Sequence, residues 1–459
     1  MSAANRIPGK GRLTPALTAR FTIDGRTLTA YEGDTVASAM IANGMHLAGR
    51  SFKYHRPRGI LTAGPEEPNA LLDVSRDAAR RQPNVRATVQ EVFDGMKIET
   101  QNRWPSLKYD IGAVNSLLSP FLSAGFYYKT FMWPKAFWEK LYEPIIRKAA
   151  GLGKTPFIAD PDRYEKAWAH CDLLVIGSGP AGLMAARAAA RAGLRVILAD
   201  EGFRLGGSLL SERVTVGGVS AAEYAASVVE ELKSLSNVTL MPRTTVFGWY
   251  DDNVFGAVEK VQKHVAQPSG ELPVERVWRI VARRAILASG AEERPLVFGG
   301  NDKPGVMTSG AVRTYVNRYG VAAGQNVAIF TNGGAGYRTA ADLVAAGVGV
   351  AAIIDGRTQS SDVAPSGVRV IRGGSVIDTK GYFRIKGLIA ERVGHQEEIA
   401  CDALAMSGGY SPIVHLACQR GAKAILVGGV SGFPGARCGA GAADCRLCCR
   451  SCRACCCSA

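Results

Sequence analysis

Apolar residues in the middle of the chain occur in short runs separated by glycine-rich turns, which predicts buried strands alternating with helices. Residues 173–176 are continuously apolar, as expected for a parallel strand covered on both faces. A helix is predicted over 181–192, where Gly193 would end it, and a second strand over 195–199. The order strand, glycine turn, helix, strand is typical of a dinucleotide-binding unit and indicates an α/β fold.

The turn between this strand and this helix has the glycine spacing of such a unit. Gly177 is expected to make the turn, and Gly179 to let the backbone approach a pyrophosphate. Gly182 would let the helix lie close to the strand, and the helix N-terminus would aim its N–H groups at the phosphates. Asp200 ends the second strand, where a carboxylate can accept hydrogen bonds from both ribose hydroxyls.

Three later stretches fit the same nucleotide domain. The sequence Leu-Gly-Gly-Ser at 205–208 predicts a second close approach of the backbone to the dinucleotide. A helix over 220–235 and a strand over 238–241 lead to 244–246, where disulphide-reductase-like folds contact the adenine edge. Residues 253–281 are interpreted as a β-excursion and 284–288 as a strand. The turn 288–291 is predicted to close the domain.

A second unit repeats the pattern further along the chain. A strand is predicted from Asn326, followed by a glycine turn to Tyr337, a helix over 338–346 and a strand over 349–354 before Asp355. A further strand is predicted over 401–406. Two such units are typical of oxidoreductases with two dinucleotide domains. The glycine spacing is irregular here, so we interpret the unit first as a structural repeat and keep a second nucleotide site as the alternative.

The N-terminal region follows a different pattern. Asp24-Gly25 lies between two alternating stretches and predicts a type I′ hairpin. A helix over 36–43 follows, with Asp34 or Thr35 as N-cap and Gly44 after its end. Hairpin, acidic turn and helix are how a β-grasp ferredoxin begins. The first cysteine of the chain is Cys171, so we predict a β-grasp module without an iron–sulfur cluster.

Two segments around this module have unusual side chains. Residues 50–59 are dense in cations and rings, and they predict either a contact for an anion such as a flavin phosphate or a loop that packs on the next domain. Residues 120–142 are rich in aromatic side chains, which favours an inter-domain or subunit contact.

Composition narrows the class of protein. The formal net charge is +15, but no nucleic-acid motif accompanies it, so an acidic protein partner or polyanionic cofactors fit equally well. No apolar segment of a signal peptide is visible, and the uncharged stretch 111–128 is interpreted as a buried or interfacial hairpin. We expect a cytoplasmic protein that binds neither nucleic acid nor membrane.

The last residues change character. Eight of the 11 cysteines fall between Cys438 and Cys457, among Gly, Ala and Arg. Some have metal-ligand spacing, but no apolar residues build a supporting shell, so we predict no metal site and interpret the tail as aberrant or out of frame. The glycine segment that normally completes the first nucleotide domain would be missing, and we expect the tail to be disordered.

These patterns divide the chain. We predict a basic arm (1–19), a β-grasp ferredoxin-like domain without cysteine ligands (20–100), an aromatic-rich connecting segment (101–168), a disulphide-reductase-like FAD/NAD(P)-binding Rossmann domain with an inserted second unit (169–425, insertion about 291–400) and the Cys-rich tail (426–459).

Three long motifs carry a family resemblance. They are RSFKYHRPRGILTAGPEEPNA (50–70), GFYYKTFMWPKAFWE (125–139) and ERPLVFGGNDKPGVM (293–307), and they resemble the alpha subunit of heterotetrameric sarcosine oxidase over about 21–425. The resemblance implies oxidative demethylation of sarcosine to glycine with O2, giving H2O2 and formaldehyde or methylene-tetrahydrofolate. It implies tightly bound NAD in this chain, FAD and FMN mainly with the beta subunit, and beta, gamma and delta partners. The folate-binding half of such subunits does not follow here.

The resemblance also implies roles for individual residues, and no catalytic residue is among them. The pyrophosphate of NAD would be held by Gly177, Gly179, Pro180, Ala181 and Gly182. The adenosine ribose would be held by Asp200 and Glu201, with Gly207, Ser208 and Val246 on the adenosine side and Ser289 and Gly290 at the closing turn. Two alternatives remain: a stand-alone NAD(P)H-dependent flavoprotein reductase with FAD at Gly177 and NAD(P) at Gly333, or a non-catalytic, truncated nucleotide-binding subunit.

Overall fold

The computed structural model describes residues 4–15, 18–120, 125, 133–150, 153, 155–424 and 436–437. The chain forms two compact units, and each consists of two segments that are separate in the sequence. Unit 1 contains Met1–Pro161 and Pro295–Ser407, and unit 2 contains Asp162–Arg294 and Gly408–Ala459. The second strand–turn–helix repeat therefore belongs with the N-terminal module in unit 1.

The N-terminal part of unit 1 is a five-stranded sheet with the order β2-β1-β7-β5-β6, in which β1 and β7 run parallel. Its elements are β1 (Thr18–Ile23), β2 (Arg26–Tyr31), α1 (Val36–Ala42), β5 (Leu71–Ser75), β6 (Arg81–Arg86) and β7 (Lys97–Thr100), with the short pair β3 (Gly49–Arg50) and β4 (Pro57–Arg58). The predicted hairpin is confirmed, because Asp24 and Gly25 both have positive φ angles, 49° and 80°. The helix is confirmed too, and the Thr35 side chain accepts the Ser38 N–H as its N-cap.

In the described part of the connecting region of unit 1, the regular elements before β8 are short helices. They are η1 (Ile111–Ser116), η2 (Lys135–Phe137), η3 (Trp138–Tyr142) and α3 (Glu143–Ala150). Residues 121–124 and 126–132 of the aromatic stretch that we predicted to be a contact surface lie outside the described residues. Among the residues that are described, no helix is long and apolar enough to cross a membrane.

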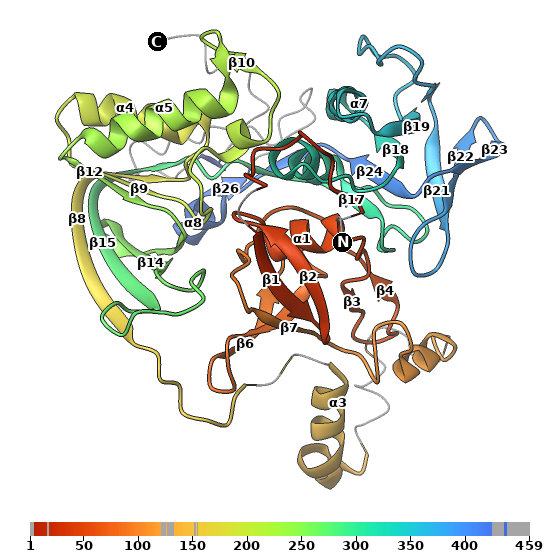
Figure 1. The fold of residues 1–459 in the computed structure, drawn as a ribbon, viewed down its shortest axis with the longest axis horizontal. Coiled ribbons are helices and arrows are strands. Elements are labelled where there is room, and N and C mark those ends of the chain that lie inside the picture. The colour runs from red at the N-terminus through yellow and green to blue at the C-terminus, as the bar shows by residue number, and fades with distance from the viewer. Residues whose placement is uncertain are drawn as a thin grey trace. The chain divides into compact units, whose positions relative to one another are not determined.

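The second part of unit 1 is a parallel sheet with the order β17-β24-β18-β19-β20, with α7 alongside β18 and β19 (Figure 1). Its elements are β17 (Val306–Thr308), α6 (Ser309–Thr314), η6 (Tyr315–Tyr319), β18 (Asn326–Thr331), α7 (Gly334–Ala345), β19 (Gly349–Asp355), β20 (Val370–Arg372) and β24 (Ala403–Ser407), with an antiparallel sheet of β21 (Ser375–Lys380), β22 (Gly387–Arg392) and β23 (His395–Ala400). The two sheets share an apolar core that includes Phe330, Ile354 and Leu388.

Unit 2 is a six-stranded sheet with the order β12-β9-β8-β15-β14-β13. Its elements are β8 (Tyr164–Ile176), α4 (Pro180–Arg191), β9 (Val196–Ala199), η4 (Gly207–Leu210), β10 (Thr215–Val216), β11 (Val219–Ser220), α5 (Ala221–Ser234), β12 (Val238–Met241), β13 (Thr244–Trp249), η5 (Asp251–Asn253), β14 (Val254–Lys260), β15 (Glu275–Leu287), β16 (Ala291–Glu293), β25 (Tyr410–Pro412), α8 (His415–Gln419), β26 (Lys423–Ala424) and β27 (Ala436–Arg437). The strands β12, β9, β8 and β15 are parallel.

The apolar run at the end of β8 is buried on both faces of this sheet, as its sequence predicts. Leu173 and Val175 pack with α4 and α5, which lie side by side in Figure 1, whereas Leu174 and Ile176 pack in a second core with Phe255. The alternation follows from the two-residue period of a strand.

Several predicted boundaries were wrong. The helix α7 begins at Gly334 rather than at residue 338, because the glycine turn itself forms the first helical turn. β15 is one strand of 13 residues that pairs along its length with β8, so it includes the end of the predicted excursion. β24 begins at Ala403, because Asp402 instead accepts N–H bonds from Gln325 and Asn326. The tail that we predicted to be disordered lies outside the described residues, apart from residues 436–437.

Candidate dinucleotide site

The glycine turn between β8 and α4 has a geometry that side chains at two positions would destroy. Gly177 has φ of 100°, and a Cβ there would lie 2.4 Å from the Ala288 carbonyl oxygen. A Cβ on Gly182 would lie 1.9 Å from the Gly177 carbonyl oxygen, so α4 can start this close to β8 only with glycine. These two glycines are therefore required by the fold of the turn.

Gly179 differs from these two glycines, because the position of its missing Cβ is open. A Cβ added there would meet no heavy atom of the described residues within 4 Å, and its φ of −63° is accessible to any residue. Gly179 is the N-cap of α4, and no acidic side chain stands in the first turn of this helix. The open space therefore lies at the N-terminus of α4. The partial positive charge of this helix end is not neutralised by an acidic residue in the first turn, so the space suits a phosphate group.

Asp200 holds this turn together. Its Oδ2 accepts the backbone N–H of Ser178 at 2.5 Å, and its Oδ1 accepts the N–H of Gly202 at 2.7 Å. The Ser178 hydroxyl in turn accepts the N–H of Gly206 at 3.1 Å. Both oxygens of the predicted ribose acceptor therefore already accept backbone N–H groups, although a carboxylate has further lone pairs.

The neighbouring acid is placed differently. Glu201 is exposed, and it follows directly after Asp200 at the end of β9. Gly207 lies against the turn, because a Cβ there would be 2.8 Å from the Gly179 Cα, and Ser208 follows it in η4. The structure thus brings the 205–208 segment next to the glycine turn.

The other predicted site residues, Val246, Ser289 and Gly290, also lie in unit 2, where each contacts other residues of that unit. Val246 is half-buried on β13 and packs against the core that contains Phe255. The Ser289 hydroxyl donates to the Ile413 carbonyl at 2.8 Å, and the Ile413 N–H donates to the Gly290 carbonyl at 3.0 Å. The closing turn therefore anchors the returning segment that begins at Gly408, beside the pair β16–β25.

Sequence reasoning missed the residues that connect these parts. Ser178 contributes both its N–H and its hydroxyl, and Gly202 contributes its N–H, to the bonds that join the turn to the end of β9. A serine between two motif glycines was the available signal for Ser178. The sequence could not indicate Ile413, because Ile413 contributes through its backbone N–H and carbonyl and not through its side chain.

The glycine turn of the second unit faces an acidic side chain. A Cβ on Gly334, at the start of α7, would lie 2.7 Å from Oδ1 of Asp362. Asp355, at the end of β19, is fully buried and accepts hydrogen bonds from Arg357 and from the Tyr337 hydroxyl at 2.9 Å. Arg357 also pairs with Asp362 at 2.8 Å, and its hydrogen bond to Asp355 raises the pKa of its guanidinium. The N-cap of α7, Gly333, is itself open, since a Cβ there would meet no heavy atom of the described residues within 4 Å, but the carboxylate of Asp362 lies beside the next residue, Gly334.

The basic segment 50–59 is used for internal packing. Arg50 is buried and donates to the Leu107 and His55 carbonyls, and His55 lies 2.6 Å from Asp110. Arg56 and Arg58 both pair with Asp302 of the second part of unit 1. Of the two interpretations offered by the sequence, packing on the next domain is the one these contacts support.

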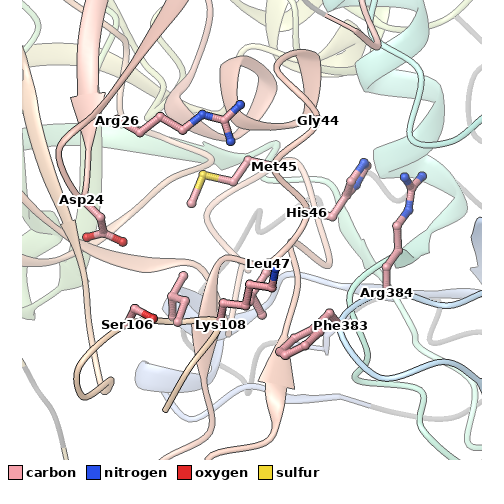
Figure 2. A pocket seen from close by; sticks show the side chains of 11 residues that line it. Asp24, Arg26, Gly44, Met45, His46, Leu47, Ser106, Lys108, Phe383 and Arg384 are labelled. Atoms are coloured by element: carbon pink, nitrogen blue, oxygen red, sulfur yellow. The ribbon is translucent and has the colours of Figure 1, made fainter.

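A separate cavity of about 420 Å³ opens in unit 1 (Figure 2). Its lining includes Arg26, Met45, His46, Phe383 and Arg384. Burial, together with the charge of Arg384, lowers the pKa of His46 to about 4, so its ring is neutral at physiological pH. Within the described residues, no group of three or more His, Cys, Asp or Glu side chains could hold a metal ion.

Comparison with known families agrees with this geometry. Residues 171–424, which include the glycine turn, match the family described as "Pyridine nucleotide-disulphide oxidoreductase". The chain belongs to this family. Residues 18–103 match the family described as "2Fe-2S iron-sulfur cluster binding domain", although they contain no cysteine. The predicted α/β fold class, a β-grasp ferredoxin-like module followed by a disulphide-reductase-like nucleotide-binding fold, is confirmed.

Relatives of this oxidoreductase chain include two proteins named "Sarcosine oxidase subunit alpha". The one from Rhizobium meliloti (strain 1021) is 60% identical over 92% of this chain and 42% of its own length. The one from Corynebacterium sp. (strain P-1) is 39% identical over 88% of this chain and 38% of its own. The resemblance predicted from the sequence is confirmed, and the chain spans about two fifths of the length of these relatives.

A solved structure supports the fold alone. The L-proline dehydrogenase from P. horikoshii superposes with a TM-score of 0.61 at 21% identity, over 93% of this chain and 66% of its own.

Proposed function

We propose that this chain is the nucleotide-binding part of a sarcosine oxidase alpha subunit and that it binds one NAD at the turn between β8 and α4. The main support is the open space at Gly179, at the N-terminus of a helix whose first turn carries no acidic residue. The pyrophosphate would lie against Gly177, Gly179, Pro180, Ala181 and Gly182.

Two carboxylates would select the nucleotide. Glu201, which is exposed beside the turn, would accept hydrogen bonds from the adenosine ribose. Asp200 would also accept a ribose hydrogen bond while it keeps its bond to the Ser178 N–H in the turn. Two acids at the end of β9 would repel a 2′-phosphate, so NAD would bind in preference to NADP. Gly207, Ser208, Val246, Ser289 and Gly290 would border the adenosine and the closing turn.

Bound NAD would supply hydride-transfer chemistry, whereas this chain's residues would bind and orient it. The family resemblance describes the NAD as tightly held rather than consumed in turnover. The complete enzyme would convert sarcosine, water and O2 into glycine, formaldehyde and H2O2, or form methylene-tetrahydrofolate when folate is present. FAD and FMN would lie mainly with the beta subunit, and gamma and delta subunits would complete a cytoplasmic complex. The buried free thiols of Cys171 and Cys401 fit a reducing compartment.

The nucleotide that the purified full-length chain releases on acid treatment tests this proposal. We expect NAD in a constant ratio to protein, identified by chromatography and mass. Release of FAD alone would instead support the stand-alone flavoprotein reductase, and release of neither would support a subunit that does not bind nucleotide. Glu201→Ala should lose NAD while Glu292→Ala, an exposed acid on β16 in the same unit, should retain it.

A further inference from the structure

The loop between β4 and β5 of the N-terminal module folds around one buried carboxylate. Glu67 is 1% exposed. Its Oε2 accepts the N–H of Leu61 at 2.9 Å and the N–H and hydroxyl of Thr62 at 2.8 and 3.2 Å. Its Oε1 accepts the N–H groups of Asn69 and Ala70 at 2.9 and 3.1 Å. Five donors thus converge on one side chain from a loop that contains no strand or helix over 59–70.

These donors match an ionised carboxylate. A carboxylate only accepts hydrogen bonds, whereas a protonated carboxyl would place a donor opposite another donor. Burial raises the pKa of Glu67, and the backbone N–H groups of Thr62, Asn69, Ala70 and Leu61 act against this shift. The loop therefore resembles an anion-binding nest whose anion is part of the chain.

The position of Glu67 is informative because of the family to which this module belongs. Residues 18–103 match a domain that binds a two-iron cluster, and plant-type clusters are bound by cysteines spaced C-x4-C-x2-C. Thr62, Glu67 and Ala70 have this spacing. Thr62 and Ala70 give Glu67 three of its five hydrogen bonds, and the remaining residue is Glu67 itself.

The opposite side of the same loop contacts the second part of unit 1. The Leu61 carbonyl accepts the N–H of Thr308 at 2.9 Å, and the Thr62 carbonyl accepts the hydroxyl of Tyr315 at 2.8 Å. Tyr315 is fully buried. Two adjacent residues, Leu61 and Thr62, therefore direct their N–H groups to Glu67 and their carbonyls to the neighbouring sheet domain.

We propose that the Glu67 carboxylate stands in for the iron–sulfur cluster as the anionic centre of this loop, and that the loop it orders fastens the ferredoxin-like module to residues 295–407. The surface that would expose a cluster to a redox partner is thereby used as an internal docking surface. Glu67 is a positioning residue, and the module serves in assembly rather than in electron transfer. This inference does not depend on where NAD binds.

Hydrogen exchange of the full-length chain, followed by mass spectrometry, tests this inference. In Glu67→Gln, the amide NH2 must face backbone N–H donors, so exchange over 59–70 and over 306–315 should become roughly tenfold faster or more. The matched control is Glu66→Gln, which removes the adjacent, exposed carboxylate and should leave both segments unchanged. Unchanged protection of 59–70 in Glu67→Gln would overturn the proposal.

Two further measurements test the proposal even if the Glu67→Gln variant does not fold. In the wild-type chain, the amides of Leu61, Thr62, Asn69 and Ala70 should be as protected as those of β5, and exchange at the rate of an open loop would contradict the proposal. Tyr315→Phe removes only the bond to the Thr62 carbonyl. It should speed exchange over 306–320 while the amides of Asn69 and Ala70 stay protected, and loss of all these protections together would show that Glu67 does not order the loop by itself.

Discussion

The carboxylate of Asp200 accepts the backbone N–H of Ser178 at 2.5 Å, so the end of β9 is tied directly to the glycine turn that follows β8. The second oxygen of Asp200 accepts the N–H of Gly202, which begins the segment leading to Gly206 and Gly207. One side chain therefore fixes both walls of the candidate dinucleotide site. This arrangement makes Asp200 a structural requirement of the site, in addition to the ribose contact that we propose for it.

Asp200→Asn should reduce both stability and nucleotide content. The amide keeps one acceptor oxygen, but its NH2 group must face a backbone N–H, which we expect to cost about 1–3 kcal/mol of unfolding free energy. The measurements are urea unfolding and the NAD released per chain. The control is Asp252→Asn, an exposed acid in η5 whose positive φ of 54° suits asparagine. Wild-type NAD content in Asp200→Asn would show that the bonds to Ser178 and Gly202 are dispensable.

The buried ring of His46 should make unit 1 less stable in mild acid. Its pKa of about 4 in the folded state is lower than the 6.5 of an unperturbed ring, so between these values the unfolded chain binds a proton that the folded chain does not. Stability should therefore fall as pH falls through this window, by about 2 kcal/mol between pH 7 and pH 5.

Urea unfolding of His46→Gln at both pH values isolates this contribution. The variant should lose less stability than the wild type on acidification, because the titrating ring is absent. His395→Gln, which removes an exposed histidine on β23, should behave like the wild type. Equal acid sensitivity in His46→Gln and the wild type would mean that other groups carry the pH dependence.

The second glycine turn should hold no nucleotide. Gly333, the N-cap of α7, is as open as Gly179, but the Asp362 carboxylate lies beside Gly334, where a phosphate at this N-terminus would meet its negative charge. Asp355 already accepts hydrogen bonds from Arg357 and Tyr337. We expect one nucleotide per chain in the wild type and the same ratio in Asp362→Asn. A ratio of two, or a ratio that changes in Asp362→Asn, would assign a nucleotide site to this turn.

The sequence was sufficient for those parts of the site that depend on local backbone geometry. Gly177 and Gly182 could be predicted because their roles follow from spacing and from the absence of a Cβ, and both are visible within one strand–turn–helix segment. The hairpin at Asp24-Gly25 was predictable for the same reason, and the N-cap of α1 could be narrowed to Asp34 or Thr35, of which the structure shows Thr35.

Contacts between distant segments were not predictable in this way. The composition of 50–59 allowed either an anion contact or packing, and only the pairing of Arg56 and Arg58 with Asp302 distinguishes them. Glu67 resembles any other acidic loop residue in the sequence, because its five donors are mostly backbone N–H groups. The length of β15 is set by its pairing with β8 rather than by its own pattern.

The most direct test of the central claim compares Gly179→Ala with Gly182→Ala. At Gly179 the added methyl group would meet no described protein atom within 4 Å and the backbone angles suit alanine, so the variant should fold with wild-type stability yet lose NAD. At Gly182 the methyl group would collide with the Gly177 carbonyl oxygen, so folding itself should suffer. Measuring released NAD together with the unfolding midpoint separates the two effects. A Gly179→Ala chain that retains its full content of NAD would contradict the proposal that the pyrophosphate occupies this space.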